Sequence, residues 1–303
     1  MKELLYFSVK VYFHVLLSIF FRKVEVIGKD NIPPYGPIIF VGNHANQFVD
    51  ALMLMCTCEH KLSHMIAEKS WKRPVVGHLA WAMGCVPVKR AQDNAKPGTG
   101  KIIVKREENQ NDASSEKTNN ENEVQEYPMI KVTGDETKFK SEINEGDKVR
   151  FPGNKIFKVM KVESDVVMYL EENESTLKIE LPEQSHAFEY LKRIDQSVVY
   201  AAVLDTLHSG GSIGIFPEGG SHDRTDLLPL KVGVSLIEYS AMVRDGINIP
   251  IVPVGLSYYR GHRFRGRAVV EYGSPIHLDP NTLDAYKAGG AGKRKVVNEF
   301  LQR

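Results

Sequence analysis

Four short apolar segments, each bounded by turn-forming residues, constrain the fold of this chain most strongly. They are Pro37–Val41, Ser212–Phe216, Ile249–Leu256 and Arg267–Tyr272. Apolar runs of this length are typical of strands that are buried on both faces and alternate with helices. The intervening stretches predict helices over 47–57, 62–69, 74–82, 195–208 and 231–243. The sequence therefore predicts an α/β fold with a mixed, largely parallel sheet flanked by helices.

The middle of the chain has a different composition. Residues 106–126 hold seven acidic and two basic residues among Asn, Gln and Ser, too few apolar side chains to form a core, so a disordered linker is predicted. Short alternating segments punctuated by Gly, Asp, Asn and Pro follow over 127–186 and indicate an inserted small all-β module of about five strands. The chain is thus predicted to consist of an N-terminal helix (1–23), two halves of one α/β domain (24–105 and 187–280) and a C-terminal tail (281–303). The linker (106–126) and the β module (127–186) lie between the two halves.

Residues 4–21 are mostly apolar and aromatic, are interrupted by Lys10 and His14, and are closed by Arg22 and Lys23. A charged residue near the middle disfavours a membrane span, since a lysine at that depth is expensive. We expect a membrane-associated helix lying at the interface, with Lys10 reaching out to the lipid headgroups. The alternative is an ordinary helix buried against the domain.

Charge and cysteine content exclude several classes of protein. The 39 Lys and Arg nearly cancel the 38 Asp and Glu, giving a net charge of +1, which excludes a nucleic-acid partner held by bulk attraction. The three cysteines are too few for a disulfide framework, and they form no zinc-binding spacing with histidine. The sequence predicts neither a metal site nor nucleic-acid binding.

The first chemically distinctive segment runs from Val41 to Asp50 with the sequence VGNHANQFVD. His44 is expected in the loop after a strand, and Asp50 in the first turns of the following helix. Asn46 is the candidate N-cap of that helix. The carboxylate then fixes one ring nitrogen of His44 and leaves the other to act as a general base. A loop histidine merely capped by a nearby aspartate is the alternative interpretation.

The second distinctive segment is IFPEGGSHDRTD, which begins at Ile215 and is followed by Lys231. Gly219 and Gly220 allow the backbone to approach a ligand closely. Arg224 and Lys231 at a strand end suit an anion such as a phosphomonoester. Glu218 is placed to orient these cations or a substrate hydroxyl. A polar strand-to-helix loop without a ligand is the alternative.

These two segments together resemble the glycerophospholipid acyltransferases, and more closely their fungal-type glycerol-3-phosphate/dihydroxyacetone-phosphate O-acyltransferase branch. Gly84–Arg90 and Ile249–Gly255 resemble two further blocks of the family, in the family's order. The usual first motif has four residues between its His and its Asp, whereas this chain has five. Pro87 stands where the family commonly has an aromatic residue.

The resemblance implies direct acyl transfer without a resident cofactor, acyl-CoA being a co-substrate. His44, held by Asp50, would deprotonate the sn-1 hydroxyl of glycerol-3-phosphate or dihydroxyacetone phosphate, giving lysophosphatidic acid from the former. The acceptor's phosphate would be held by cations and its pocket shaped by the second segment. The implied substrate-binding residues are Arg90, Glu218, Gly219, Gly220, Arg224 and Lys231. The implied acyl-donor side consists of Pro250, Val252 and Pro253.

The same resemblance implies membrane lipid as a partner and a place at the endoplasmic reticulum, with the catalytic site facing the cytosol. Two alternatives remain open. One is an enzyme that acylates a lysophospholipid, and the other is a catalytically silent membrane lipid-binding protein.

Overall fold

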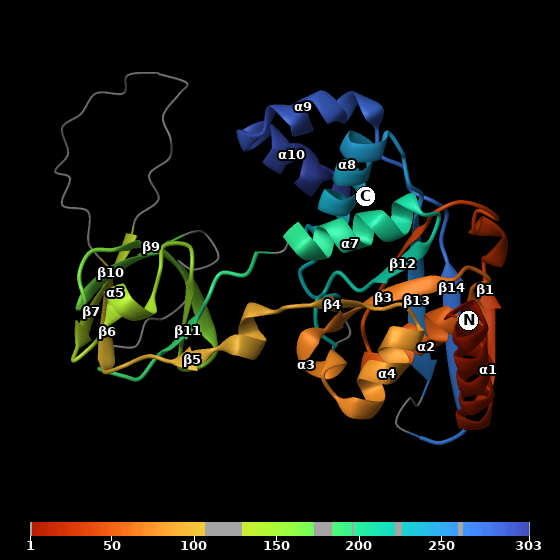
Figure 1. Cartoon of the computed structure of the whole chain (residues 1–303), viewed down its shortest axis with the longest axis horizontal. Helices are drawn as coiled ribbons and strands as arrows, with labels where there is room; N and C mark the ends of the chain where they lie inside the picture. The colour runs from red at the N-terminus through yellow and green to blue at the C-terminus, as the bar shows by residue number, and fades with distance from the viewer. Residues whose placement is uncertain are drawn as a thin grey trace. The chain divides into compact units, whose positions relative to one another are not determined.

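The structure of the chain is a computed structural model in which residues 2–106, 129–172, 184–195, 197–221, 226–259 and 263–302 are described (Figure 1). The chain forms two compact units. The first combines Met1–Val88 with Gln196–Arg303, and the second is Lys89–Asp195. Residues 107–126 of the predicted linker lie outside the described residues.

A seven-stranded sheet forms the centre of the first unit. The strand order is β1-β14-β13-β2-β12-β3-β4, and every neighbouring pair is parallel except β13 with β14. The bounds are β1 Phe21–Ile27, β2 Ile39–Gly42, β3 Leu62–Ala67, β4 Val86–Val88, β12 Ser212–Ile215, β13 Ile251–Tyr259 and β14 Gly266–Tyr272. This arrangement confirms the predicted α/β fold with its mixed, largely parallel sheet.

Helices cover both faces of this sheet. They are α1 Lys2–Phe20, α2 Gln47–Thr57, α3 Glu68–Trp71, α4 Pro74–Ala82, α7 Ser197–His208, α8 Gly233–Asp245, α9 Leu283–Ala288 and α10 Gly290–Leu301, with the short 3-10 turns η1 Lys29–Asn31 and η3 Pro280–Thr282. Along β2, Phe40 packs with residues of α1 and α2 whereas Ile39 packs with residues of α7, α8 and α10. Because successive side chains of a strand point to opposite faces, two hydrophobic cores form on either side of one sheet.

The predicted helices over 47–57 and 74–82 are confirmed by α2 and α4, but the helix predicted over 62–69 is wrong. Residues 62–67 form β3, which pairs with β12 on one side and β4 on the other. Leu62 and His64 are buried there. A six-residue run can satisfy either periodicity, and here the long-range strand pairing decides.

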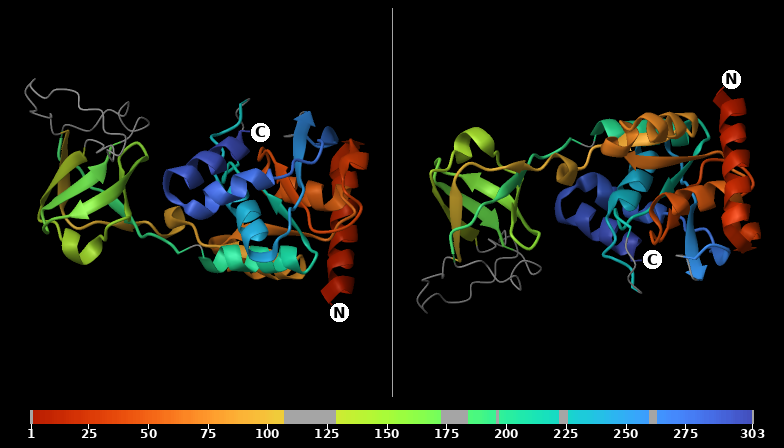
Figure 2. Two further views of the ribbon diagram at one scale, coloured as in Figure 1. Left: turned by 90° about the horizontal axis from the view of Figure 1, so that it is seen from above. Right: turned by 90° about the horizontal axis from the view of Figure 1, so that it is seen from below.

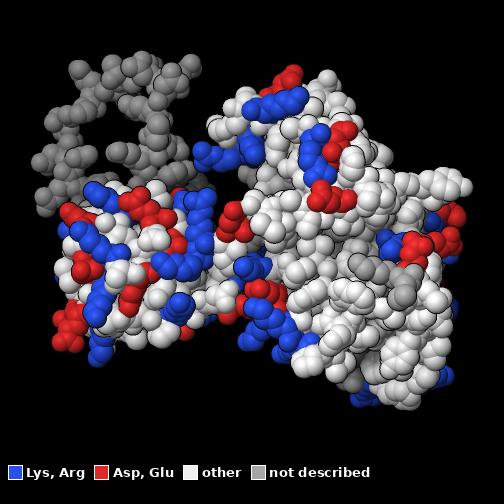
Figure 3. Space-filling view, viewed as in Figure 1, with Lys and Arg blue, Asp and Glu red and all other residues white. Residues whose placement is uncertain are grey.

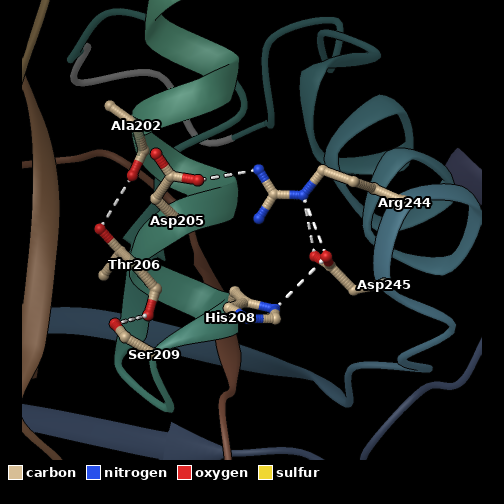
Figure 4. A network of polar contacts seen from close by, with 7 residues as sticks. All are labelled: Ala202, Asp205, Thr206, His208, Ser209, Arg244 and Asp245. Atoms are coloured by element: carbon tan, nitrogen blue, oxygen red, sulfur yellow. Dashed lines mark hydrogen bonds and ion pairs between the residues drawn. The ribbon is translucent and has the colours of Figure 1, made fainter.

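The two C-terminal helices are part of the first unit, whereas the sequence predicted a separate tail over 281–303. Val296, Val297 and Phe300 of α10 are buried in the core beside α8. Helices α7 and α8 in this layer are joined by an ion pair between Arg244 and Asp205 at 2.9 Å, and Arg244 also pairs with its neighbour Asp245 at 3.0 Å (Figure 4). This side of the sheet is therefore a packed layer of helices.

The second unit contains a seven-stranded antiparallel sheet in the order β5-β11-β8-β9-β10-β7-β6. Its elements are η2 Ala91–Asn94, β5 Lys96–Pro97, β6 Lys101–Arg106, β7 Met129–Asp135, α5 Phe139–Glu142, β8 Lys148–Phe151, β9 Lys155–Val162, β10 Val167–Glu171 and β11 Glu189–Leu191. It differs from the predicted all-β module over 127–186 in holding one helical turn. It also takes β5 and β6 from before the linker and β11 from after 186, because their backbones pair with this sheet.

Helix α1, red in Figure 2, packs within the first unit against α2, α4 and β1. Lys10 does not reach outwards as predicted. Its ammonium donates a hydrogen bond to the carbonyl of Cys58 at 2.7 Å, directly after the end of α2. Carbonyls at a helix C-terminus attract a cation, so the half-buried Lys10 is held against the end of α2.

Candidate active site

His44 and Asp50 form the predicted pair at the carboxyl end of β2. Nδ1 of His44 lies 2.9 Å from Oδ2 of Asp50. The aspartate is 0 % exposed, whereas the histidine side chain is 19 % exposed. With Nδ1 donating to the carboxylate, the lone pair of the ring lies on Nε2, which is the arrangement required of a general base.

Asp50 is held by two further donors. Its Oδ2 accepts the N–H of Asn46 at 2.7 Å, and its Oδ1 accepts the hydroxyl of Tyr258 at 2.6 Å. Burial and the neighbouring Asp50 raise the pKa of Tyr258, so this hydroxyl stays protonated and donates. Asn46 occupies the N-cap position of α2 without a side-chain capping bond, and its backbone N–H is bound by Asp50. A buried carboxylate with three donors has one fixed orientation.

The imidazole of His44 is also fixed from its flat side. Its ring stacks on Phe216 with 4.5 Å between centroids and 14° between planes. A Cβ on Gly42 would lie only 3.1 Å from the ring of Phe216, so the glycine leaves space for this ring. Stacking and the bond to Asp50 together leave the histidine little rotational freedom.

Glu218 is buried and ties three backbone segments together. Its Oε1 accepts the N–H of His44 at 2.7 Å, and its Oε2 accepts the N–H of Leu228 at 3.2 Å. The loop after β12 therefore holds the loop after β2. These bonds give Glu218 a role in positioning the histidine, and contact with substrate stays a prediction for it.

A cation lies at the same edge of the sheet. The ammonium of Lys231 occupies the space over Gly219, where any Cβ would collide with it; the φ of +71° at this glycine also favours a residue without Cβ. The N–H of Lys231 donates to the carbonyl of Pro217 at 2.9 Å. No heavy atom lies within 4 Å of the Cβ position of Gly220 among the described residues. Space and positive charge thus adjoin the Glu218 loop.

The structure does not test the two arginines predicted to bind phosphate. Arg90 belongs to the second unit, where its guanidinium pairs with both oxygens of Asp93, at 2.8 and 3.1 Å. Arg224 lies outside the described residues. Both remain predictions, and Lys231 is the predicted cation that the structure places within the first unit beside Gly219.

The residues predicted for the acyl-donor side belong to β13 or directly precede it. Val252 is 0 % exposed within the core that also holds Phe40 and Leu54. Pro250 and Pro253 are half-buried, and their carbonyls accept the N–H groups of Ile39 and Gly273. Val252 therefore supports the sheet, and donor contact by these three residues stays a prediction. Among the described residues no three His, Cys, Asp or Glu side chains cluster to hold a metal ion.

Sequence reasoning missed Tyr258, Phe216 and Asn43 as parts of the site. The side-chain amide of Asn43 exchanges two hydrogen bonds with the backbone of Leu256, at 2.9 and 2.7 Å, which fixes the end of β2 against β13. Phe216 lies two residues before Glu218 in the second distinctive segment, so its place in the sequence could have indicated that it belongs to the site. Tyr258 lies 208 residues from Asp50, and its role depends on strand order, which no local pattern carries.

Several known proteins are similar to this chain in sequence. An acyltransferase family model matches residues 23–127. The chain is 35% identical over 310 residues to glycerol-3-phosphate O-acyltransferase 1 of Saccharomyces cerevisiae, covering 99% of this chain and 38% of that protein. It is 32% identical over 305 residues to glycerol-3-phosphate O-acyltransferase 2 of the same yeast, covering 96% and 40%. The chain thus spans about two fifths of the length of these relatives.

A solved structure, the 1-acyl-sn-glycerophosphate acyltransferase PlsC of Thermotoga maritima, aligns over 99% of this chain and 80% of its own with 11% identity and a TM-score of 0.46. His44 and Asp50 lie within the range that the acyltransferase family model matches. The chain therefore contains an acyltransferase-family domain over residues 23–127 and is similar over most of its length to yeast glycerol-3-phosphate O-acyltransferases.

Proposed function

We propose that the chain is an acyl-CoA-dependent O-acyltransferase that acylates the sn-1 hydroxyl of glycerol-3-phosphate or dihydroxyacetone phosphate. The observation that carries the proposal is the histidine fixed by a fully buried carboxylate, at 2.9 Å, beside a cation and a glycine at the same sheet edge. Ligands of open α/β sheets bind at the carboxyl ends of the strands. The relatives named above support the choice of acceptor.

The reaction follows from the placement of His44. Its Nε2 takes the proton of the acceptor hydroxyl as that oxygen forms a bond to the thioester carbonyl carbon. The imidazolium formed is stabilised by Asp50 through Nδ1 and by the face of Phe216. When the tetrahedral intermediate collapses, the C–S bond breaks and Nε2 returns the proton to the leaving thiolate. The acceptor's phosphate lies towards Lys231, which is a point charge suited to it.

Purified protein with radiolabelled acyl-CoA and each acceptor in turn tests the proposal. We expect lysophosphatidic acid from glycerol-3-phosphate, with a loss of at least about a thousandfold in turnover for His44→Ala. Turnover of a lysophospholipid alone would transfer the same chemistry to a larger acceptor. Equal product from wild type and His44→Ala would reject the general-base mechanism. Binding of lipid without product would indicate a silent binding protein.

We further infer that the enzyme works at a membrane, since its proposed product is a lipid and α1 carries exposed apolar side chains. We place it at the endoplasmic reticulum with the site facing the cytosol, because the acyl-CoA headgroup is highly charged and does not cross a bilayer. Fractionation of cells that express the tagged protein tests the compartment, and protease protection of the tag in sealed microsomes tests the orientation. Recovery in another fraction would contradict the compartment.

A further inference from the structure

The inner face of α1 is locked to the first unit. Tyr6 is 0 % exposed, and its hydroxyl accepts the N–H of Leu62 at 2.8 Å. One turn later Lys10 donates to the carbonyl of Cys58 at 2.7 Å. Undocking α1 into a membrane would leave this backbone N–H without its partner and take an uncompensated ammonium along. A helix so held lies along the unit, although Glu3–Phe20 are long and apolar enough to cross a bilayer.

Most of the exposed side chains described in the same helix are apolar; the exceptions are Glu3, Ser8, His14 and Ser18. Nine large side chains, each 39–74 % exposed, cover its length: Leu4, Leu5, Phe7, Val11, Tyr12, Val15, Leu16, Ile19 and Phe20. The exposed serines of this helix need no water, since Ser8 donates to the carbonyl of Leu4 and Ser18 to that of His14, at 2.8 and 2.9 Å. An apolar surface this extensive marks an interaction site.

The exposed apolar surface continues beyond α1. Helix α4 is one of the helices that α1 contacts, and its Val75 and Trp81 are 73 % and 52 % exposed. In Figure 3 the face over α1 and α4 is largely white, with few charged side chains. At the end of α1 the ring of Phe264, 66 % exposed, lies edge-on to Phe20 with 6.1 Å between centroids. The N–H of Arg265 donates to the carbonyl of Phe20 at 2.7 Å, so the hairpin end is attached to the helix.

Exposed arginines beside this apolar surface indicate the kind of partner that it binds. Three exposed arginines surround the end of α1, next to its exposed apolar side chains: Arg22, Arg263 and Arg265. Apolar side chains flanked by arginines match the boundary between acyl chains and anionic headgroups. The 19 residues of α1 extend about 28 Å in one line, a length suited to a planar lipid surface.

We propose that α1, α4 and Phe264 form one surface that inserts into a single leaflet of an anionic bilayer, with α1 parallel to the membrane and both of its ends on the same side. This inference rests on the proposed function only in the expectation of a lipid partner. It adds α4 and the β13–β14 connection to the membrane-bound surface and excludes a transmembrane α1.

Vesicle flotation tests the surface. The triple variant Phe7→Ser, Val11→Ser, Val15→Ser is expected to bind vesicles of phosphatidylcholine with 30% phosphatidylserine about tenfold or more weakly than wild type, since it removes apolar area and leaves the docked face intact. The matched control is Tyr35→Ser, Val198→Ser, Val243→Ser, which changes side chains that are 88, 75 and 45 % exposed on other elements. Equal loss in both triples, or wild-type protein that dimerises through α1 and does not float, would overturn the proposal.

Trp81→Ser and Phe264→Ser are each expected to weaken binding about threefold or more; no effect of either would remove α4 or the hairpin from the surface.

Cysteine labelling tests the orientation. Glu3→Cys and Arg22→Cys place a thiol near each end of α1. Of the native cysteines Cys56 is half-buried and Cys58 and Cys85 are buried, and burial raises the pKa of each thiol to about 11. On protein bound to sealed vesicles, a membrane-impermeant maleimide is expected to label both variants as fully as after detergent, relative to the unmodified parent. Protection of one end alone would show a spanning helix and overturn the proposal. His44→Ala should float and label normally, so a failure of acyl transfer leaves this result independent.

Discussion

Removing the hydroxyl of Tyr258 is the sharpest test of how the site is held. This hydroxyl donates to Oδ1 of Asp50 at 2.6 Å, and the aspartate is 0 % exposed. In Tyr258→Phe the oxygen loses its donor, while Asn46 and His44 still bind Oδ2. The carboxylate can then rotate, and its interaction with the imidazolium weakens as that cation forms.

The expected loss in kcat follows from the energy of a hydrogen bond to a charged group. A hydrogen bond to a charged group contributes about 1.5–3 kcal/mol, and about 1.4 kcal/mol corresponds to a tenfold change in rate. Since two donors to Asp50 remain, the lower part of the range applies, and kcat should fall about 10- to 30-fold. Tyr258 bonds to Asp50 and is not placed against substrate, so the KM values for acyl-CoA and acceptor should stay within about twofold.

Tyr272→Phe is the matched control. Tyr272 is buried, and its hydroxyl bonds with the side chain of Thr57 at 2.7 Å, apart from the dyad. Initial rates over a range of both substrates, with urea unfolding of each variant, separate catalysis from stability. If Tyr258→Phe keeps the kcat of wild type, or both variants lose activity in proportion to stability, the positioning role of Tyr258 is wrong.

Three other side-chain changes test the fold around the site. Burial raises the pKa of Glu238 to about 8 from 4.5, so this carboxyl is neutral in the fold and ionised after unfolding between these values. Stability should fall as pH rises from about 4.5 to 8, by up to about 1.4 kcal/mol per unit, and Glu238→Gln should flatten the curve in urea unfolding at pH 5, 7 and 9. Gly214→Ala drives a Cβ into the buried ring of His64 and should destabilise by about 1–3 kcal/mol. Gly220→Ala, facing open space, should leave stability within about 0.5 kcal/mol.

Each of these outcomes can fail separately. An unchanged pH dependence in Glu238→Gln would mean that another group titrates. Equal stability losses in Gly214→Ala and Gly220→Ala would mean that the ring of His64 moves freely, in contrast to the close approach that the structure shows.

The sequence predicts those features that depend on neighbouring residues. The buried strands over 37–41 and 212–216 were recognisable because their apolar runs end at turn formers. His44 and Asp50 were recognisable because a strand, a loop and a helix start follow one another within ten residues. The pair meets although five residues separate it, since the loop and the first helical turn bring the side chains together.

Features that depend on strand order could not be predicted. Residues 62–67 have a pattern compatible with a helix until β12 and β4 are known to flank them. Tyr258 reaches Asp50 only because β13 pairs with β2. The sequence predicts Lys10 at the lipid headgroups, since nothing in its surroundings along the chain indicates that the carbonyl at the end of α2, 48 residues away, accepts a hydrogen bond from it.

The five residues between His44 and Asp50 include a strained backbone position, Gln47, from which a final prediction follows. Gln47 begins α2 with a φ of 38°, in the left-handed region that disfavours L side chains by about 1–2 kcal/mol, and its side chain is exposed. Gln47→Gly should therefore stabilise the protein, by about 0.5–1 kcal/mol after the greater entropy of an unfolded glycine, in urea unfolding. Gln47→Ala, which keeps the strain, should be neutral. If Gln47→Gly destabilises the chain as much as a glycine in an ordinary first turn, the extra residue is accommodated without strain, and the turn between His44 and Asp50 is relaxed.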